Sequence, residues 1–171
     1  MKGGGIMDEK RIRKALKNDD EAFVEPIMEK KEKLKRIAYK YCLNDAMCED
    51  AISETIYQAY KNRKKCREPQ YFDTWLIRIL INNCLKEINQ QKKNYELKID
   101  IHDDHQKDIP LRFMVYGLDE PERSIIILHF FEKATLKEIA EYLNMPLSTI
   151  KSKYYKVLEE LKYQLKEGEY E

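Results

Sequence analysis

The sequence is poor in residues that interrupt helices. Its 171 residues include only 5 glycines and 5 prolines, whereas 37% of the residues are charged and 43% are hydrophobic. Few helix breakers, together with apolar residues at helical spacings, favour an all-α protein. No apolar run approaches the ~20 residues that a membrane span requires, so we expect a soluble, cytoplasmic protein.

Histidine and cysteine are scarce as well. The chain has four cysteines, Cys42, Cys48, Cys66 and Cys84. They form no CxxC pair and none lies at a metal-like spacing from a histidine, so we predict reduced thiols that are buried or half-buried. His102 and His105 form an HxxH pattern without a further ligand nearby, which favours a solvated linker over a metal site. Because catalytic triads and glycine-rich phosphate loops are also missing, we predict no metal, no cofactor, no small-molecule substrate and no enzymatic activity.

Charge divides the chain into two halves. Residues 1–100 contain 22 Lys+Arg and 17 Asp+Glu, a formal charge of +5, whereas residues 101–171 contain 10 and 14, a charge of −4. The change falls in a polar stretch without helical periodicity. We therefore expect two helical domains, 8–93 and 112–171, joined by a flexible linker, 94–111. Residues 1–7, MKGGGIM, are expected to be disordered, either as a leader ahead of Met7 or as an expression scar.

Apolar spacing predicts how the first domain packs. Asp19 and Asn44 are good N-cap residues, and Asp73 is predicted to cap the helix that follows it. That helix, 74–90, is apolar nearly all round in its first half and is therefore predicted to be central. Two buried stripes are predicted before it. They are Leu34, Ile37, Ala38 and Tyr41, and then Ile52, Ile56, Ala59 and Tyr60.

A basic segment with aromatic residues precedes the central helix. Its cations and rings are Tyr60, Lys61, Arg63, Lys64, Lys65, Arg67, Tyr71, Phe72 and Trp75. Single-stranded nucleic acid needs this combination, because cations bind its phosphates and aromatic rings stack on its bases. Trp75, Arg78, Asn82 and Lys86 then share one stripe of the helix. A solvated loop with Phe72 and Trp75 in the core explains the pattern equally well, so both interpretations remain open.

Residues 136–161, LKEIAEYLNMPLSTIKSKYYKVLEEL, predict a helix-turn-helix with its turn at 144–146. Capping boxes are predicted at Thr135/Glu138 and at Asp119/Glu122. The last helix is predicted to start near Ser148. Its outward-facing side chains suit contacts with base edges and phosphates in a major groove. We favour this interpretation over a plain amphipathic helix with a solvated lysine face. The outward-facing residues are Ser148, Thr149, Lys151, Ser152, Lys153 and Lys156. Three lysines in a domain of charge −4 predict weak, salt-sensitive DNA binding.

An acidic helix face also lies in the first domain. It contains Glu49, Asp50, Ser53, Glu54 and Gln58, with Tyr57 on its flank. Such a face is either a protein-docking surface or simply solvated, and the pattern does not choose between them.

Three stretches in this order resemble the small two-domain bacterial sigma factors of the extracytoplasmic-function (ECF) group. They are CEDAISETIYQAY, FDTWLIRILINNCLKEI and LDEPERSIIILHFFEKATLKEIAEYLNMPLSTIKSKYYKVLEELK, and the resemblance runs from about Phe23 to Lys162. It implies a protein that binds core RNA polymerase, directs it to promoter DNA and helps to open the duplex. It also implies control by an anti-sigma factor, which in this family is often membrane-bound.

The resemblance assigns roles to three sets of residues. Polymerase binding falls on Asp50, Ser53, Glu54, Ile56 and Tyr57. Recognition of the downstream promoter element as a single strand falls on Arg63, Lys64, Lys65, Arg67, Tyr71, Phe72, Trp75, Arg78 and Asn82. Recognition of the upstream element as duplex falls on Ser148, Thr149, Lys151, Ser152, Lys153 and Lys156.

Two departures from the family pattern bear on these roles. Ser53 stands where the family usually has Gln, and lysines stand where its recognition helix usually has arginines. Lysine lacks the bidentate fork with which arginine reads guanine, so the sequence does not predict which bases are read. The alternative is a stand-alone helix-turn-helix regulator that binds duplex DNA as a dimer and is not a polymerase subunit.

Overall fold

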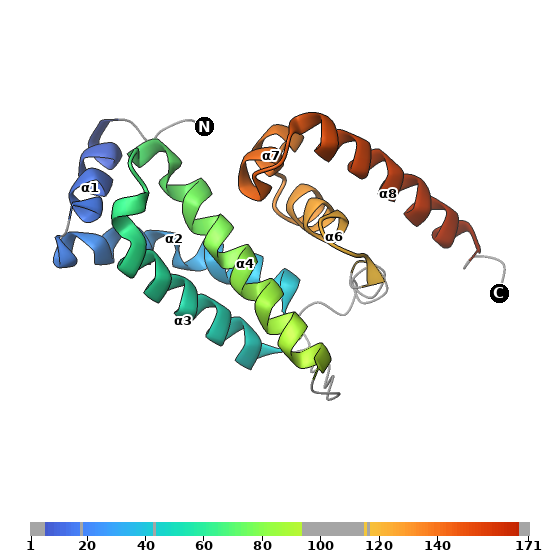
Figure 1. The fold of residues 1–171 in the computed structure, drawn as a ribbon, viewed down its shortest axis with the longest axis horizontal. Helices are drawn as coiled ribbons and strands as arrows, with labels where there is room; N and C mark the ends of the chain where they lie inside the picture. Colours follow the sequence, from blue (N-terminus) through green and yellow to red (C-terminus); the bar gives the residue numbers. More distant parts are fainter. Residues whose placement is uncertain (1–5, 18, 43, 94–114, 116, 168–171) are drawn as a thin grey trace. The chain divides into compact units, whose positions relative to one another are not determined.

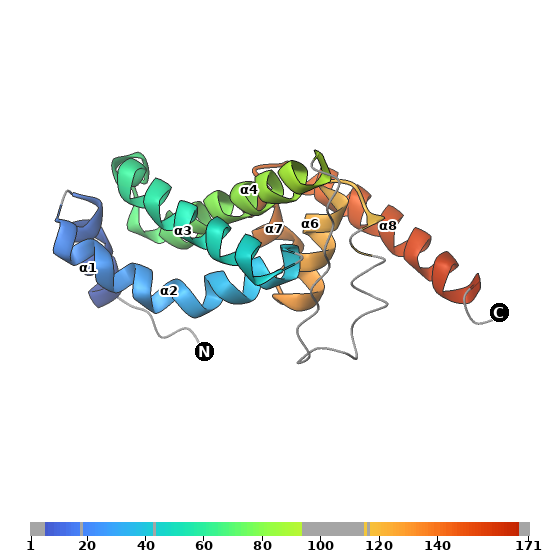
Figure 2. The same ribbon diagram turned by 90° about the horizontal axis from the view of Figure 1, so that it is seen from below.

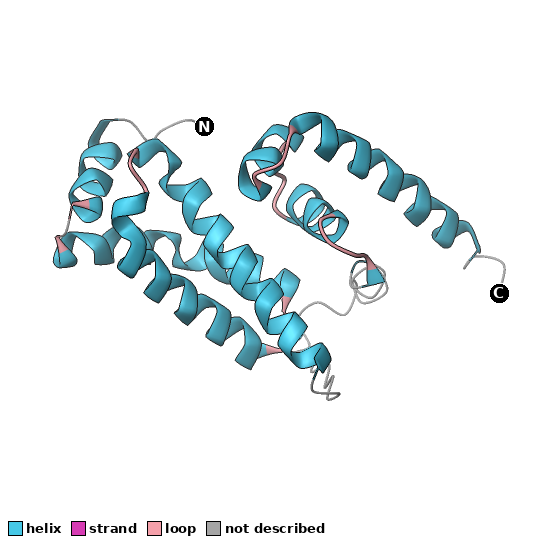
Figure 3. Cartoon of the chain, viewed as in Figure 1, coloured by secondary structure: helices cyan, strands magenta, loops and turns pink. Residues whose placement is uncertain are grey.

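The computed structural model describes residues 6–17, 19–42, 44–93, 115 and 117–167 (Figure 1). Across these ranges the regular elements are helices and no strand is present (Figure 3), which confirms the predicted all-α fold. The chain divides into two compact units, Met1–Ile101 and His102–Glu171. The predicted linker, 94–111, and the HxxH pattern within it lie outside the described residues. None of the described helices is both long and apolar enough to cross a membrane.

The N-terminal unit is a bundle of α-helices with two short 3₁₀ turns. Its elements are α1 (Ile6–Leu16), α2 (Asp20–Tyr41), α3 (Asp45–Asn62), η1 (Arg63–Lys65), η2 (Pro69–Tyr71) and α4 (Phe72–Lys93). Helices α2, α3 and α4 pack on one another, and α1 packs on α2, η1 and η2 (Figure 2). Helix α1 thus begins two residues before the domain boundary predicted at residue 8.

Local capping and apolar periodicity build this unit largely as predicted. The side chains of Asp19 and Asn44 accept hydrogen bonds from the backbone N–H groups of Ala22 and Met47, each at 2.9 Å. These bonds satisfy donors that a helix start otherwise leaves unpaired. The first predicted stripe of α2 is fully buried, and α4 supplies much of the remaining core. The buried residues of α4 are Phe72, Leu76, Ile77, Leu80, Ile81, Asn83, Cys84 and Ile88. All four cysteines are buried, as predicted.

Two predictions about this unit were wrong. Ile56 is only half-buried and Tyr60 is 39% exposed, although its ring packs edge-on against Phe23 with centroids 5.7 Å apart. Asp73 is not an N-cap, because α4 begins one residue earlier, at Phe72. Its carboxylate instead forms ion pairs with Lys30 at 2.9 Å and Lys33 at 3.6 Å, which join α4 to α2.

A buried polar chain connects α3 to α4. The Asn83 side chain donates to the Thr55 hydroxyl at 3.1 Å, and that hydroxyl donates to the Ala51 carbonyl at 2.6 Å. The Gln58 amide donates to Asn83 at 3.3 Å and to the Glu54 carboxylate at 2.7 Å. Because Asn83 is only 4% exposed, a partner left unpaired there loses a hydrogen bond that water does not replace.

Asn83→Ala is therefore expected to lower the free energy of unfolding by about 1–3 kcal/mol. The matched control is Asn82→Ala, since this neighbouring residue is exposed and such a change costs less than about 0.5 kcal/mol. Urea unfolding followed by the fluorescence of the single tryptophan, Trp75, measures both. Equal destabilisation by the two variants would contradict the role of the buried chain.

The C-terminal unit consists of short helices packed on one long one. Its described elements are α6 (Glu122–Ile126), the π-helical segment η4 (Ile127–Phe131), α7 (Leu136–Leu143) and α8 (Leu147–Glu167). Helix α8 packs on α6 and α7, and α7 packs on η4. The buried apolar residues of these elements are Ile125, Ile126, Ile127, Leu128, Ile139, Ile150, Val157 and Leu161.

The predicted helix-turn-helix is present. The capping box at Thr135 and Glu138 forms in full: the Glu138 N–H donates to the Thr135 hydroxyl at 3.2 Å, and the Thr135 N–H donates to the Glu138 carboxylate at 2.8 Å. Asn144 ends α7 in the left-handed conformation, with φ 53° and ψ 46°, which asparagine tolerates better than most residues. The turn therefore follows from local chemistry.

One further helix start differs from the prediction. Asp119 and Glu122 form no capping box, since the cap position of α6 is Pro121 and no side chain bonds there. The Glu120 carboxylate accepts from the Ser124 hydroxyl at 2.6 Å instead. Helix α8 begins at Leu147, one residue before Ser148, and thus close to the predicted start.

Candidate nucleic-acid interface

The basic segment between α3 and α4 separates into exposed and buried residues. Lys64, Lys65 and Arg67 are exposed, and Tyr71 is 55% exposed. The two 3₁₀ turns η1 and η2 hold this segment close to the start of α4. Exposed cations thus stand near an exposed ring, the combination that binds single-stranded nucleic acid.

Arg63 does not join this exposed set. Its guanidinium is buried, donates to the Tyr60 carbonyl and to the Asp20 carboxylate, both at 2.7 Å, and lies 4.2 Å from the centroid of the Tyr60 ring. These interactions join the segment to the start of α2. In this structure Arg63 therefore holds the segment in place, and its guanidinium is engaged inside the fold rather than exposed for the predicted DNA contact.

Phe72 is a core residue as well. It is 0% exposed and packs against Trp75 with ring centroids 6.1 Å apart. Trp75 and Arg78 are half-buried, and Asn82 is exposed. The side chains of α4 that are predicted to contact DNA are thus half-buried at its start and exposed further along the helix. Phe72 packs against Trp75 from the core side. In this arrangement Phe72 presents no surface to a base, and Trp75 is the more accessible of the two rings.

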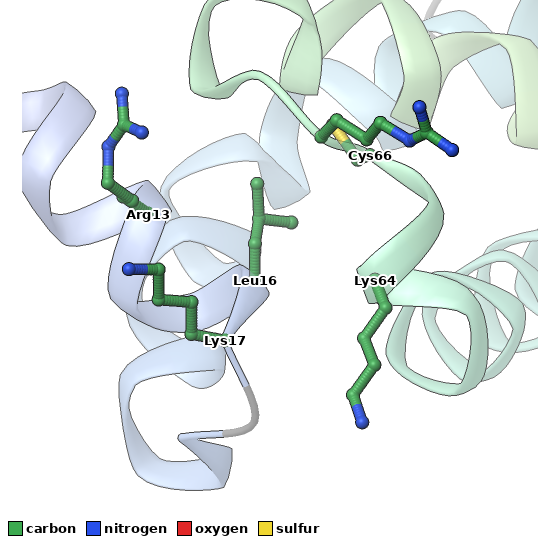
Figure 4. A pocket seen from close by; sticks show the side chains of 6 residues that line it. Arg13, Leu16, Lys17, Lys64 and Cys66 are labelled. Carbon is green, nitrogen blue, oxygen red and sulfur yellow. The ribbon is translucent and has the colours of Figure 1, made fainter.

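Helix α1 adds cations that sequence patterns did not indicate. Arg13 and Lys17, four residues apart, lie across a recess from the segment that carries Lys64 (Figure 4). Together they surround a pocket of about 360 Å³. The full lining is Arg13, Leu16, Lys17, Lys64, Cys66 and Arg67. Arg13 lies in the last turn of α1 and Lys17 directly follows the helix, but only the packing of α1 on η1 shows that this end of the helix meets the basic segment.

A second surface lies between α2 and α3. It is a groove of about 430 Å³ lined by Asp20, Phe23, Val24, Ile27, Met28, Ser53, Ile56, Tyr57 and Tyr60. Val24, Met28 and Tyr57 are 56–57% exposed. Three residues predicted to bind polymerase, Ser53, Ile56 and Tyr57, line it, whereas Asp50 and Glu54 do not.

The acidic members of that predicted set differ in their surroundings. Asp50 is exposed on α3, while Glu54 is half-buried and accepts the hydrogen bond from Gln58. Val24 and Met28 belong to α2, where no pattern had marked them. Exposed apolar side chains gathered in a groove are typical of a protein-binding surface.

The third surface is the first half of α8. Ser148, Lys151, Ser152 and Lys156 are exposed and Thr149 is half-buried. Side chains in the first turns of such a helix are those that reach base edges in the major groove. Four of the six predicted residues are therefore fully available for DNA.

Lys153 is engaged inside the unit. Its ammonium group contacts the Glu122 carboxylate at 2.8 Å, which ties α8 to α6. Burial is the largest single influence and would raise the pKa of Glu122, but the hydrogen bonds from Lys153 and from the backbone, together with the charges of Lys153 and Lys156, outweigh it and lower the pKa. The pair stabilises the unit above the ordinary pKa of glutamate, and this stabilisation is lost as the pH falls through the lowered pKa. In this structure Lys153 thus joins α8 to α6, and its predicted phosphate contact would compete with the Glu122 carboxylate.

Comparison with known proteins assigns both units to one family. The family model of sigma-70 region 2 matches residues 27–94, and that of sigma-70 region 4 matches residues 116–162. The RNA polymerase sigma factor SigV of Bacillus subtilis is 30% identical over 166 residues, covering 93% of this chain and 96% of that protein. The ECF RNA polymerase sigma factor SigW of the same organism is 26% identical over 184 residues, covering 95% and 98%.

The fold agrees with a solved structure. The chain of CnrH, determined in complex with the cytosolic domain of CnrY, superposes with a TM-score of 0.74 at 16% identity over 94% of this chain and 98% of that one. Both sigma regions are thus present in order on a chain of matching length. This chain belongs to the extracytoplasmic-function RNA polymerase sigma factors and is an alternative sigma factor that directs RNA polymerase to promoters.

Proposed function

We propose that three separate surfaces of this chain carry out promoter-directed initiation. The α2–α3 groove binds core RNA polymerase, the segment 64–71 with α4 holds one promoter strand, and the start of α8 reads the upstream element as duplex. The observation that carries the proposal is the exposure of Lys64, Lys65, Arg67 and Tyr71 beside the half-buried Trp75. A regulator that binds only duplex DNA has no use for such a surface.

The downstream surface supplies the energy for strand separation. An exposed ring that stacks on an unpaired base contributes about 1–3 kcal/mol, which offsets part of the cost of unpairing that base. Two buried residues fix this surface. Arg63 donates a hydrogen bond to the Asp20 carboxylate, and Phe72 packs against the Trp75 ring. The segment is thereby positioned before DNA arrives, which reduces the ordering cost of binding.

The upstream surface is weak on its own. Lys151 and Lys156 are exposed, but Lys153 is paired internally, and Lys156 lies 3.7 Å from the Glu160 carboxylate. Few free cations in a unit with acidic neighbours bind phosphates weakly. When polymerase holds both units on one promoter, the second binding event becomes intramolecular. Two units that each bind DNA weakly then give high overall affinity for the promoter.

In vitro transcription with core polymerase, with and without this protein, tests the function. Promoter-specific run-off product is expected only when both are present. Firm binding of the isolated protein to promoter duplex at physiological salt, with no stimulation of polymerase, would instead support the stand-alone dimeric regulator. In the proposed mechanism polymerase performs the catalysis, in the cytoplasm, and the sigma factor supplies recognition.

The groove yields a prediction for polymerase binding. Met28→Glu places a charge among exposed apolar residues and is expected to weaken binding to core polymerase at least ~10-fold, because burying an unpaired charge at an interface is costly. The matched control is Ala46→Glu, an exposed position in the first turn of α3, where a carboxylate suits the helix dipole. Fluorescence anisotropy with labelled protein measures both. Equal affinities of the two variants would remove the groove from the polymerase interface.

We further propose a protein partner of the anti-sigma class. CnrH was solved in complex with the cytosolic domain of CnrY, and this chain shares its fold. The α2–α3 groove, with its exposed Val24, Met28 and Tyr57, offers such a partner an apolar surface shared with polymerase. A partner bound there competes with polymerase directly, and attachment of the partner to a membrane would couple that competition to an external signal.

A further inference from the structure

The basic pocket beside α1 has no internal counter-charge. Its lining contains four cations, Arg13, Lys17, Lys64 and Arg67, and no carboxylate. Arg11, on the same helix, is by contrast paired with Glu25 at 2.7 Å and Glu29 at 3.1 Å. Within the described part of the chain, none of the four pocket cations forms a side-chain hydrogen bond or ion pair. Like charges held around one recess repel one another, and an anion in the recess relieves that repulsion.

The remaining lining suits an anion as well. Cys66 is 5% exposed, and its thiol donates to the Glu68 carbonyl at 3.6 Å. Burial raises the pKa of this thiol, so it stays neutral and adds no negative charge beside the pocket. Leu16 lies between the two cationic walls (Figure 4). The recess is thus a positively charged site with a neutral, partly apolar lining.

We propose that this pocket binds a backbone phosphate of the promoter strand that the segment 64–71 holds, which makes α1 part of the DNA interface. The inference rests on the proposed role of that segment and extends it. Lys64 and Arg67 belong both to the pocket and to the segment that carries the exposed Tyr71. A strand that stacks a base on Tyr71 therefore passes within reach of the pocket. Two guanidinium groups supply the donor forks that match phosphate oxygens.

DNA explains the pocket better than an acidic protein does. The cations adjoin an exposed aromatic ring, and this combination serves bases and phosphates together. Arg13 and Lys17 come from the end of α1 and the residue that follows it, and Lys64 and Arg67 come from the basic segment, so cations from two separate segments can reach a single anionic group in the pocket. The site thereby fixes the position of one phosphate and, with it, the register of the neighbouring base on Tyr71.

The test uses holoenzyme assembled from core polymerase and the full chain, on a forked promoter fragment with a single-stranded downstream segment. Arg13→Ala with Lys17→Ala is expected to weaken binding roughly 10-fold. The slope of log affinity against log salt should become shallower by about 0.7 for each phosphate that the variant no longer neutralises. The matched control is Lys10→Ala with Lys14→Ala, which removes the same charge from exposed positions on α1 that do not line the pocket. It should stay within about 2-fold of the parent protein, because distant exposed charges are screened.

A scan with single methylphosphonate linkages, which are neutral, then locates the phosphate. One linkage, or two adjacent ones, should weaken binding by the parent protein and have no further effect on R13A/K17A. Equal losses of affinity in the two double variants would show a general charge effect and overturn the site. Unchanged affinity in both variants would also overturn it. If the isolated chain bound inorganic phosphate but no methylphosphonate linkage changed the affinity for the promoter fragment, the ligand of the pocket would be a free anion instead. Binding of an acidic peptide to the pocket, without displacement of DNA from the holoenzyme, would identify a protein ligand instead.

Failure of the two proposals is distinguishable. Parent holoenzyme that does not bind the forked fragment contradicts the proposed function of the segment. Parent holoenzyme that binds, with R13A/K17A binding equally well, contradicts only the phosphate site. Circular dichroism of both double variants checks that α1 is retained, and alanine favours helix at Lys10, Arg13 and Lys14, the three substituted positions within α1.

Discussion

Replacing Lys151 and Lys156 together by glutamate is expected to reduce promoter-directed transcription about 100-fold or more. Both side chains are exposed in the first half of α8, where they can meet phosphates beside the major groove. The change removes two attractive charges and introduces two that repel DNA. Binding to core polymerase should be unchanged, because the polymerase groove is assigned to the other unit. Run-off transcription and polymerase anisotropy measure the two quantities separately.

A single pair of variants controls for net charge. Lys151→Glu and Lys162→Glu make the same change on the same helix, and both residues are exposed. Eleven residues of α-helix separate them by about 16 Å. Only the first should lower transcription from the promoter, by about 10-fold or more. Equal losses from both, or unchanged promoter selection by the double variant, would remove α8 from the recognition of the upstream element.

Tyr71→Ala is expected to impair promoter opening about 5- to 100-fold on duplex templates, which corresponds to the loss of one stacked base. The tyrosine is 55% exposed, so its removal leaves the core intact. On a template already unpaired over the downstream element the loss should be much smaller, because the cost of unpairing no longer has to be offset. Permanganate footprinting of unpaired thymines reports opening directly, and polymerase affinity serves as the reference.

Tyr39→Ala is the control for that variant. Tyr39 is 42% exposed and lies at the far end of α2, close to the start of α3. The segment 64–71 follows the other end of α3, a helix of 18 residues that spans about 27 Å. The control should open promoters normally. If Tyr71→Ala also opened duplex promoters at the parental rate, the ring would have no part in strand separation.

The structure explains how a recognition helix in an acidic unit can serve transcription. Lys153 is held by Glu122 at 2.8 Å, which leaves α8 with few cations for phosphate. The other unit carries exposed Lys64, Lys65 and Arg67, and in our proposal the pocket cations of α1 add to them. In the proposed mechanism each unit alone binds DNA weakly, and polymerase that holds both units on one promoter makes the second binding event intramolecular, so that the two affinities combine.

Local features of the fold were predictable because their causes are local. The caps at Asp19 and Asn44 and the capping box at Thr135 depend on side chains that bond backbone groups two or three residues away. The turn at Asn144 depends on one residue that accepts a positive φ. Apolar periodicity likewise showed which face of each long helix is buried. The family resemblance followed from these same stretches, and the comparisons confirmed it.

Residue type alone did not determine which side chains are available to a ligand. Arg63, Phe72 and Lys153 have the chemistry of DNA-binding residues, yet a carboxylate or an aromatic ring engages each of them inside the fold. Those partners lie up to 43 residues away in the sequence. Exposure depends on such distant packing, which no local pattern encodes.

The sequence by itself determined the helices, the caps at Asp19, Asn44 and Thr135, the two-part organisation and the family, because each depends on short-range spacing or on contiguous motifs. Tertiary structure alone decided the surfaces. It turned Arg63 and Lys153 into supports, and it placed Met28 of α2 beside Tyr57 of α3 in one groove. It also brought α1 against the basic segment, so that cations about fifty residues apart in the sequence surround one pocket. The physical reason is that a binding surface is built where helices pack, and the side chains that meet there come from segments far apart in the chain.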